Sequence, residues 1–125
     1  YTYDYSNFRA LCPAPVRRIL MPATPTIYGR RLRQARKAAR WTQPELGRQL
    51  GWEDAAAAVR ISRYENGQHM PDGPTADALA KALRLPQAWF FAETDAIAEA
   101  ILILSRLSEV RQEELLVALK AATGR

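Results

Sequence analysis

The sequence has very few of the residues that build metal centres and covalent active sites. Among its 125 residues are one cysteine, Cys12, and one histidine, His69. A structural zinc site needs about four Cys or His ligands, and a catalytic thiol needs a histidine base placed by a recognisable motif. No glycine-rich phosphate loop is present, and the adjacent carboxylates Glu113 and Glu114 would diverge on a helix. We therefore expect no catalytic residue, metal, cofactor or small-molecule ligand, and hence no enzyme.

Long apolar runs are missing as well. The longest strongly apolar run, residues 101–104, is far shorter than the roughly 20 residues that cross a bilayer as a helix. Pro13, Pro15 and the Arg17-Arg18 pair interrupt the first 20 residues, where a signal peptide would need a continuous apolar core. We therefore expect a cytoplasmic protein without membrane association. With 48% hydrophobic and 25% charged residues, the chain has the composition of one ordinary domain.

Positive charge, in contrast, is present and concentrated in one half of the chain. The formal net charge is +5, and residues 27–70 alone carry nine basic and four acidic side chains. Residues 71–125 carry six basic and eight acidic side chains. A basic helix can be no more than a solvated face. A surplus confined to one segment nevertheless favours a polyanionic partner such as double-stranded DNA.

Hydrophobic periodicity predicts an all-α chain. A first helix is expected from Ile27 to Ala39, where apolar residues recur every three or four positions beside a stripe of basic residues. Thr42 stands where an N-cap should for a second helix, which Gly51 ends. A third helix is predicted over residues 55–66, with Asp54 as its cap, and a fourth starts at Gly73. A short fifth helix is expected to pack Trp89, Phe90 and Phe91 into the core.

Two segments flank these helices. Residues 1–26 hold four of the eight prolines and no apolar period, which predicts a flexible N-terminal arm. Residues 93–125 predict two further helices, the first of them apolar over more than half of its circumference. Such an excess marks a partner surface, although both helices could instead fold back on their own core. We expect a homodimer formed through Ile97, Ile101, Leu104 and Leu107.

One series of motifs carries a family resemblance. In chain order its parts are Leu32-Arg33 with Arg36, Thr42-Gln43-Pro44-Glu45-Leu46, Leu50-Gly51, Ile61-Ser62-Arg63-Tyr64-Glu65-Asn66-Gly67, Pro71 and Leu79-Ala80-Lys81-Ala82-Leu83. From Ile27 to about Phe91 the chain resembles the Cro/Xre-type helix-turn-helix family of phage repressors and bacterial transcription regulators. The resemblance implies a five-helix DNA-binding domain over residues 27–92, followed here by two additional C-terminal helices. The chain departs from the pattern by having nine residues between Gly51 and Ile61, which lengthens either the turn or the third helix.

The resemblance places the third helix in the major groove of DNA. With Ile61 turned inward, a helical period of about 100° per residue turns a different set outward. These outward residues are the candidates for base readout: Ala56, Val59, Arg60 and Arg63. Arg63 suits a bidentate pair with guanine and Val59 a thymine methyl, whereas Arg60 can equally reach a phosphate. The candidates for phosphate contacts are Arg33, Arg40, Thr42, Gln43, Ser62 and Asn66.

The resemblance also implies an ion pair with a structural role. In the family, the residues that match Arg36 and Glu65 pair between the first and third helices. The expected function is a sequence-specific, dimeric transcription regulator, and specifically a repressor. The alternatives are an antitoxin that binds DNA and captures a toxin with its C-terminal helices, and a helical protein-binding module without DNA binding.

Overall fold

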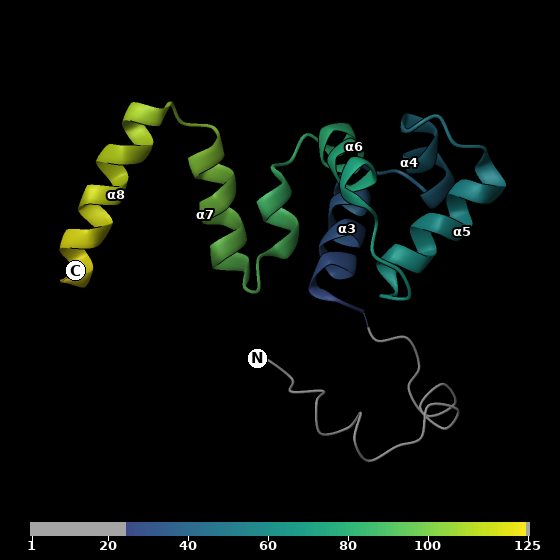
Figure 1. The fold of residues 1–125 in the computed structure, drawn as a ribbon, viewed down its shortest axis with the longest axis horizontal. Helices are drawn as coiled ribbons and strands as arrows, with labels where there is room; N and C mark the ends of the chain where they lie inside the picture. Colours follow the sequence, from purple (N-terminus) through teal and green to yellow (C-terminus); the bar gives the residue numbers. More distant parts are fainter. Residues whose placement is uncertain (1–24, 125) are drawn as a thin grey trace, which may run out of the picture.

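The computed structural model describes residues 25–124, and every regular element in this range is a helix. The elements are α3 (Ile27–Ala38), α4 (Gln43–Gln49), α5 (Asp54–Glu65), α6 (Gly73–Leu83), the 3-10 helix η1 (Gln87–Phe91), α7 (Asp95–Ser105) and α8 (Glu109–Thr123) (Figure 1). The all-α prediction, five helices followed by two more, is therefore confirmed. The arm predicted for residues 1–26 lies outside the described residues, apart from Pro25 and Thr26.

Short polar side chains define where most helices begin. The caps that accept a hydrogen bond from a backbone N–H in the first turn are Thr26, Thr42, Asp72, Thr94 and Ser108. The predicted cap Asp54 is wrong: it is the first residue of α5, and Glu53 occupies the cap position without a side-chain bond. Asp54 instead accepts two bonds from Arg48, at 2.7 and 3.1 Å. Only residues 50–53 separate α4 from α5, so the extra residues before Ile61 lengthen the helix rather than the turn.

The core lies between α3, α4, α5, α6 and η1. Its largest fully buried side chains are Leu32, Leu46, Ile61, Leu79 and Phe90. Each such side chain contributes roughly 1.5–3 kcal/mol to folding when it leaves water. Trp89 and Phe90 are buried as predicted, whereas Phe91 is 53% exposed, because a tight 3-10 turn cannot direct three consecutive aromatic residues inward.

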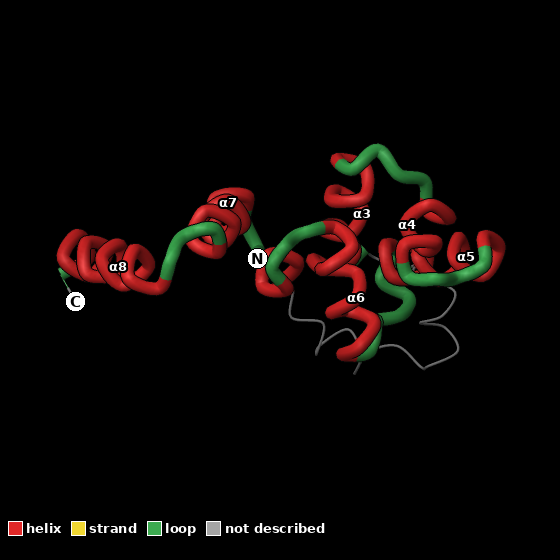
Figure 2. The backbone as a smooth tube through the Cα atoms, turned by 90° about the horizontal axis from the view of Figure 1, so that it is seen from above, coloured by secondary structure: helices red, strands yellow, loops and turns green. Residues whose placement is uncertain are grey.

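The helices form an extended arrangement with two distinct ends. In Figure 1 and in the perpendicular view of Figure 2, α4 and α5 lie at one end, and α7 and α8 extend toward the other. Helix α7 joins the body through Ala98, which is buried against the core, whereas α8 has no buried residue. The end of the molecule that carries α5 is therefore not covered by the C-terminal helices.

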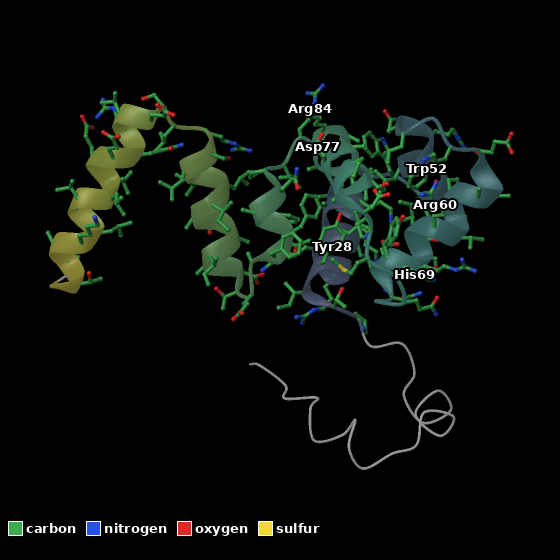
Figure 3. All side chains as sticks on the ribbon, in the orientation of Figure 1. Tyr28, Trp52, Arg60, His69, Asp77 and Arg84 are labelled. Atoms are coloured by element: carbon green, nitrogen blue, oxygen red, sulfur yellow. The ribbon has the colours of Figure 1, made fainter. Side chains whose placement is uncertain are left out.

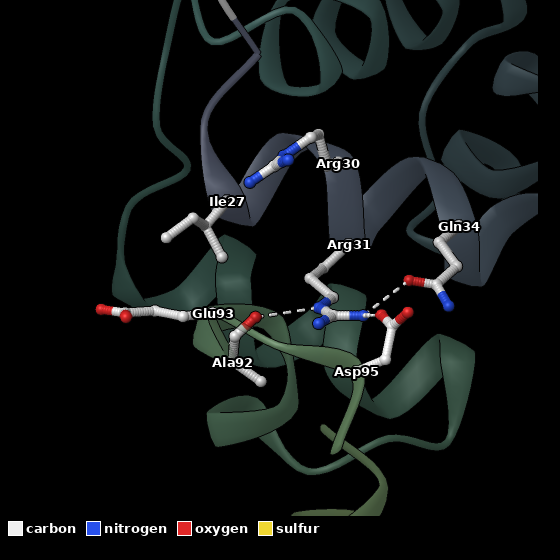
Figure 4. A pocket seen from close by; sticks show the side chains of 7 residues that line it. All are labelled: Ile27, Arg30, Arg31, Gln34, Ala92, Glu93 and Asp95. Carbon is white, nitrogen blue, oxygen red and sulfur yellow. Dashed lines mark hydrogen bonds and ion pairs between the residues drawn. The ribbon is translucent and has the colours of Figure 1, made fainter. Parts of the chain in front are cut away.

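A buried arginine links the body to α7. Arg31 Nε donates to the carbonyl oxygen of Ala92 at 3.0 Å, and one terminal nitrogen donates to Gln34 at 2.9 Å and to Asp95 at 3.0 Å (Figure 4). Its guanidinium carbon also lies 5.5 Å from the centre of the Trp89 ring. Arg31, Gln34, Ala92 and Asp95 border a pocket of about 210 Å³ between α3 and the start of α7. Arg31 therefore has a structural role that the sequence analysis did not predict.

Candidate nucleic-acid interface

Helices α4 and α5 pack so closely that they form one unit. The contact is made at Gly47, where an added Cβ would collide with the side chain of Ala57. Leu46 and Ile61, both fully buried, fill the space between these helices and the core. The orientation of α5 is therefore set by apolar packing on its inner face.

The outer face of α5 is open to solvent. All four predicted base-reading residues, Ala56, Val59, Arg60 and Arg63, are exposed in the described chain. The inner face is formed by other residues of the same helix: Ala57, Ile61, Tyr64 and Glu65. The division of the helix into two faces thus follows the helical period.

Arg60 differs from the other three because a neighbouring aromatic ring holds it. Its guanidinium carbon lies 3.9 Å from the centre of the Trp52 ring, and Figure 3 shows the two side chains beside each other. Trp52 was not among the predicted site residues. Its position within the longer segment between Gly51 and Ile61 was the available signal, because an aromatic residue next to a new helix start can pack against that helix.

Two of the predicted phosphate contacts lie at the start of α4. The Thr42 hydroxyl accepts from the Glu45 N–H at 3.3 Å, and the Glu45 carboxylate accepts from the Thr42 N–H. Hydrogen bonding by Thr42, through its backbone and then its side chain, lowers the pKa of Glu45 below its usual value. The hydroxyl proton of Thr42 stays available. Gln43 is half-buried, and its amide donates to Glu65 at 2.7 Å, so this side chain ties α4 to α5.

The other phosphate candidates lie on α3 and at the end of α5. Arg33 and Arg40 are exposed, and Arg40 directly follows the α3 cap with a φ of 60°, in the left-handed region. Asn66 donates to the hydroxyl oxygen of Ser62 at 3.2 Å. This bond leaves the Ser62 hydroxyl proton and the second Asn66 amide hydrogen free to donate elsewhere.

The expected ion pair between Arg36 and Glu65 is present. Arg36 Nε lies 2.9 Å from Glu65 Oε1, and the two side chains are only 12% and 3% exposed. A second Arg36 nitrogen donates to the carbonyl oxygen of Trp41 at 2.9 Å, and the second Glu65 oxygen accepts from Gln43. The pair therefore connects α3, α4 and α5, with hydrogen bonds to both of its members.

The predicted dimerisation residues are not equally accessible. Ile97 is 48% exposed, whereas Ile101, Leu104 and Leu107 are half-buried, and Ile101 packs against the core of its own chain. Further exposed apolar residues are Ile103 on α7 and, on α8, Val110, Leu115, Leu116, Val117 and Leu119. The sequence analysis placed the interface on the first C-terminal helix and did not include the apolar residues of α8.

Residues 25–124 hold neither a metal-binding cluster nor a membrane-spanning helix. No group of three or more His, Cys, Asp or Glu side chains in this range could hold a metal ion. No helix in the same range has the length and apolar character needed to cross a membrane.

The chain is similar to a known protein family and to a solved structure. A family model described as a helix-turn-helix domain matches residues 27–89, half of the sequence. The crystal structure of the transcriptional regulator BswR matches with 33% identity and a TM-score of 0.63, covering 74% of this chain and 92% of that one. No curated protein sequence matches. The chain belongs to the helix-turn-helix family of transcription regulators.

Proposed function

We propose that the protein is a sequence-specific, DNA-binding repressor that inserts α5 into the major groove as a homodimer. The observation that carries the proposal is the exposed outer face of α5, with Val59 and Arg63 at its centre. The helix is anchored from behind by Ile61 and by the ion pair of Glu65. The major groove is wide enough to admit an α-helix held in this way.

Arg63 is the principal base-reading residue in this proposal. Its guanidinium can donate two parallel hydrogen bonds to guanine O6 and N7, which gives about 1–3 kcal/mol of discrimination against the wrong base. Val59, one turn earlier on the same face, can contact a thymine methyl. Ala56 is small enough to let the backbone of α5 approach the base edges.

Contacts with phosphates fix the register of the protein on DNA. The Thr42 hydroxyl and the free Asn66 amide hydrogen are directed donors, whereas Arg33 and Arg40 contribute charge. Each phosphate neutralised should steepen the dependence of log K on log salt by about 0.9. These contacts support binding to any duplex and carry no sequence information.

Dimerisation uses the apolar surface of α7 and α8. Ile103 is 51% exposed and α8 has no buried residue. A second copy that covers this surface would therefore remove a large apolar area from water. A two-fold dimer would present its two α5 helices to half-sites about 34–36 Å apart. Sedimentation should show a dimer for the wild type and a monomer for Ile103→Glu. The control Ser105→Glu adds the same charge on the opposite side of α7 and should stay dimeric.

A DNA selection from a random library tests the central proposal. The purified protein should select a palindromic sequence, and Arg63→Ala should relax the preference at one base pair in each half-site. Arg84→Ala, which removes an arginine at the end of α6 (Figure 3), should leave the selected sequence unchanged. Equal losses of Arg63→Ala on selected and random DNA would contradict base readout. A reporter with the selected site over its promoter should fall in expression if the protein represses.

The exposed apolar surface of α8 also suits a second function, that of an antitoxin. In that case α8 would be covered by a different protein, a toxin, rather than by a second copy of this chain. A purified chain that is monomeric alone, but forms a stoichiometric complex with a neighbouring gene product, would favour the antitoxin. A dimer that already buries α8 would favour the repressor.

A further inference from the structure

The stacked pair of Trp52 and Arg60 is unusual among the exposed arginines of the DNA-binding half. The distance of 3.9 Å between the Arg60 guanidinium carbon and the centre of the indole corresponds to direct contact of the two planar groups. A guanidinium over the face of Trp is attracted by the ring quadrupole. The stack occupies only the face of the guanidinium and leaves the N–H groups along its edge able to donate.

Trp52 is a fixed platform rather than a mobile side chain. It is half-buried and packs against the hydrophobic core. Its six-membered ring lies so close to Gly47 that a Cβ added there would come within 3.4 Å of it. The residue stands between α4 and α5 in the chain, so its ring is positioned by the same packing that sets the orientation of α5.

The position of Arg60 on α5 is at the side of the outer face. At about 100° per residue, Val59 and Arg63 lie nearly opposite the buried Ile61, whereas Arg60 and Ser62 lie about 100° from it on opposite sides. When a helix lies along a groove, residues of the central line point to the base edges and residues on the flanks point to the two sugar-phosphate backbones. Arg60 is therefore directed toward a phosphate.

No carboxylate neutralises Arg60 within residues 25–124. The carboxylate of Asp72 lines a pocket of about 310 Å³ together with Arg60, Arg63 and His69. The Asp72 carboxylate accepts a hydrogen bond from the Thr75 N–H at 2.8 Å as the cap of α6. Hydrogen bonding by Thr75 and, less strongly, the charge of Arg60 lower the pKa of Asp72. The two side chains form no ion pair, so the edge of the Arg60 guanidinium stays open to a polyanion.

We propose that Trp52 is a positioning residue that holds Arg60 on the flank of α5 as a phosphate contact, and that Arg60 does not read bases. The short connection between α4 and α5 thus supplies a ring that fixes one DNA contact in advance of binding. This inference rests on the proposed function, because it requires DNA to lie along the outer face of α5.

A double-mutant cycle on duplex binding tests the role of Trp52. The probe is a labelled 20-base-pair duplex of random sequence, titrated by fluorescence anisotropy over a series of salt concentrations. Arg60→Ala should lower the slope of log K against log salt by about 0.9. Trp52→Leu should weaken binding about two- to fivefold in the wild-type background, as expected from a stack of this kind. It should have no further effect in the Arg60→Ala background, and Trp52→Phe should restore most of the affinity.

The control variant is Trp41→Leu, which removes another half-buried indole that packs on the core. Any effect of Trp41→Leu on affinity should be the same with and without Arg60, because it acts only through stability. Thermal unfolding by circular dichroism verifies that each variant is folded at the assay temperature. If Trp52→Leu weakens binding equally in both backgrounds, Trp52 is not a positioning residue.

The remaining outcomes separate this inference from the proposed function. A wild-type protein that does not bind the duplex at low salt would refute DNA binding itself. If the wild type binds but Arg60→Ala selects a different base at one position of a random library, Arg60 reads a base and the phosphate assignment is wrong. If Arg60→Ala keeps the library preference of the wild type and has the smaller salt slope, the assignment of Arg60 to a phosphate is supported.

Discussion

Removing one member of the buried ion pair should destabilise the protein far more than removing both. In Arg36→Met, the Glu65 carboxylate would keep its hydrogen bond from Gln43 but lose its only ion-pair partner among the described residues. Because the Glu65 side chain is only 3% exposed, water cannot replace that partner. Breaking a buried pair in this way costs about 3–5 kcal/mol.

That loss is large compared with the stability of a domain of this size. Native domains are stable by about 5–15 kcal/mol in total. With a urea m-value of about 2 kcal/mol/M, a loss of about 4 kcal/mol moves the unfolding midpoint down by roughly 2 M. Arg36→Met should therefore unfold at a clearly lower urea concentration than the wild type, although the substitution lies far from the outer face of α5.

The double variant Arg36→Met with Glu65→Leu measures the coupling. It should lose much less than the sum of the two single losses, because no charge stays buried without a partner. Urea unfolding followed by far-ultraviolet circular dichroism gives the four free energies. The matched control is Arg48→Met, which removes the exposed partner of Asp54 and should hardly move the midpoint, since water screens that pair. Additive single losses, or an Arg36→Met variant as stable as Arg48→Met, would refute the reasoning.

Three further predictions follow from single residues. Tyr28→Phe should raise the unfolding free energy by about 1 kcal/mol in urea titrations, because the buried hydroxyl has no hydrogen-bond partner among residues 25–124. Burial raises the pKa of Tyr28 from 10.0 to about 12. The unfolded state therefore releases this proton first, so the unfolding free energy of the wild type falls as pH rises from 10 to 12. The Phe variant should lack this part of the alkaline loss of stability. Gly47→Ala should force α4 away from Ala57 and lower the unfolding free energy by about 1–3 kcal/mol, with a matching loss of duplex affinity. Arg40→Gly and Arg84→Gly should both stabilise the fold by roughly 0.5 kcal/mol, because each arginine has a left-handed backbone, with φ of 60° and 56°. Only Arg40→Gly should also weaken duplex binding and lower the slope of log K against log salt by about 0.9. If the two glycine variants bind the duplex equally well, Arg40 is not a phosphate contact.

The helices and the two faces of α5 could be predicted from the sequence because local rules determine them. Thr42 caps α4 through a hydroxyl that reaches only three residues ahead. The outward position of Val59 and Arg63 follows from the helical period once Ile61 is turned inward. Both rules depend on neighbouring residues of one helix, so they hold before the helices pack.

The contacts that complete the site were decided by the tertiary structure alone. The stack of Trp52 on Arg60 and the bond from Gln43 to Glu65 join residues of different elements. Arg31 belongs to a helix that reads simply as basic, yet it is buried because η1 and α7 pack over it. Periodicity shows which side of a helix is apolar, but not which neighbour covers that side or what lies across the contact. Those partners depend on the angles and distances between helices, which only the packed core determines.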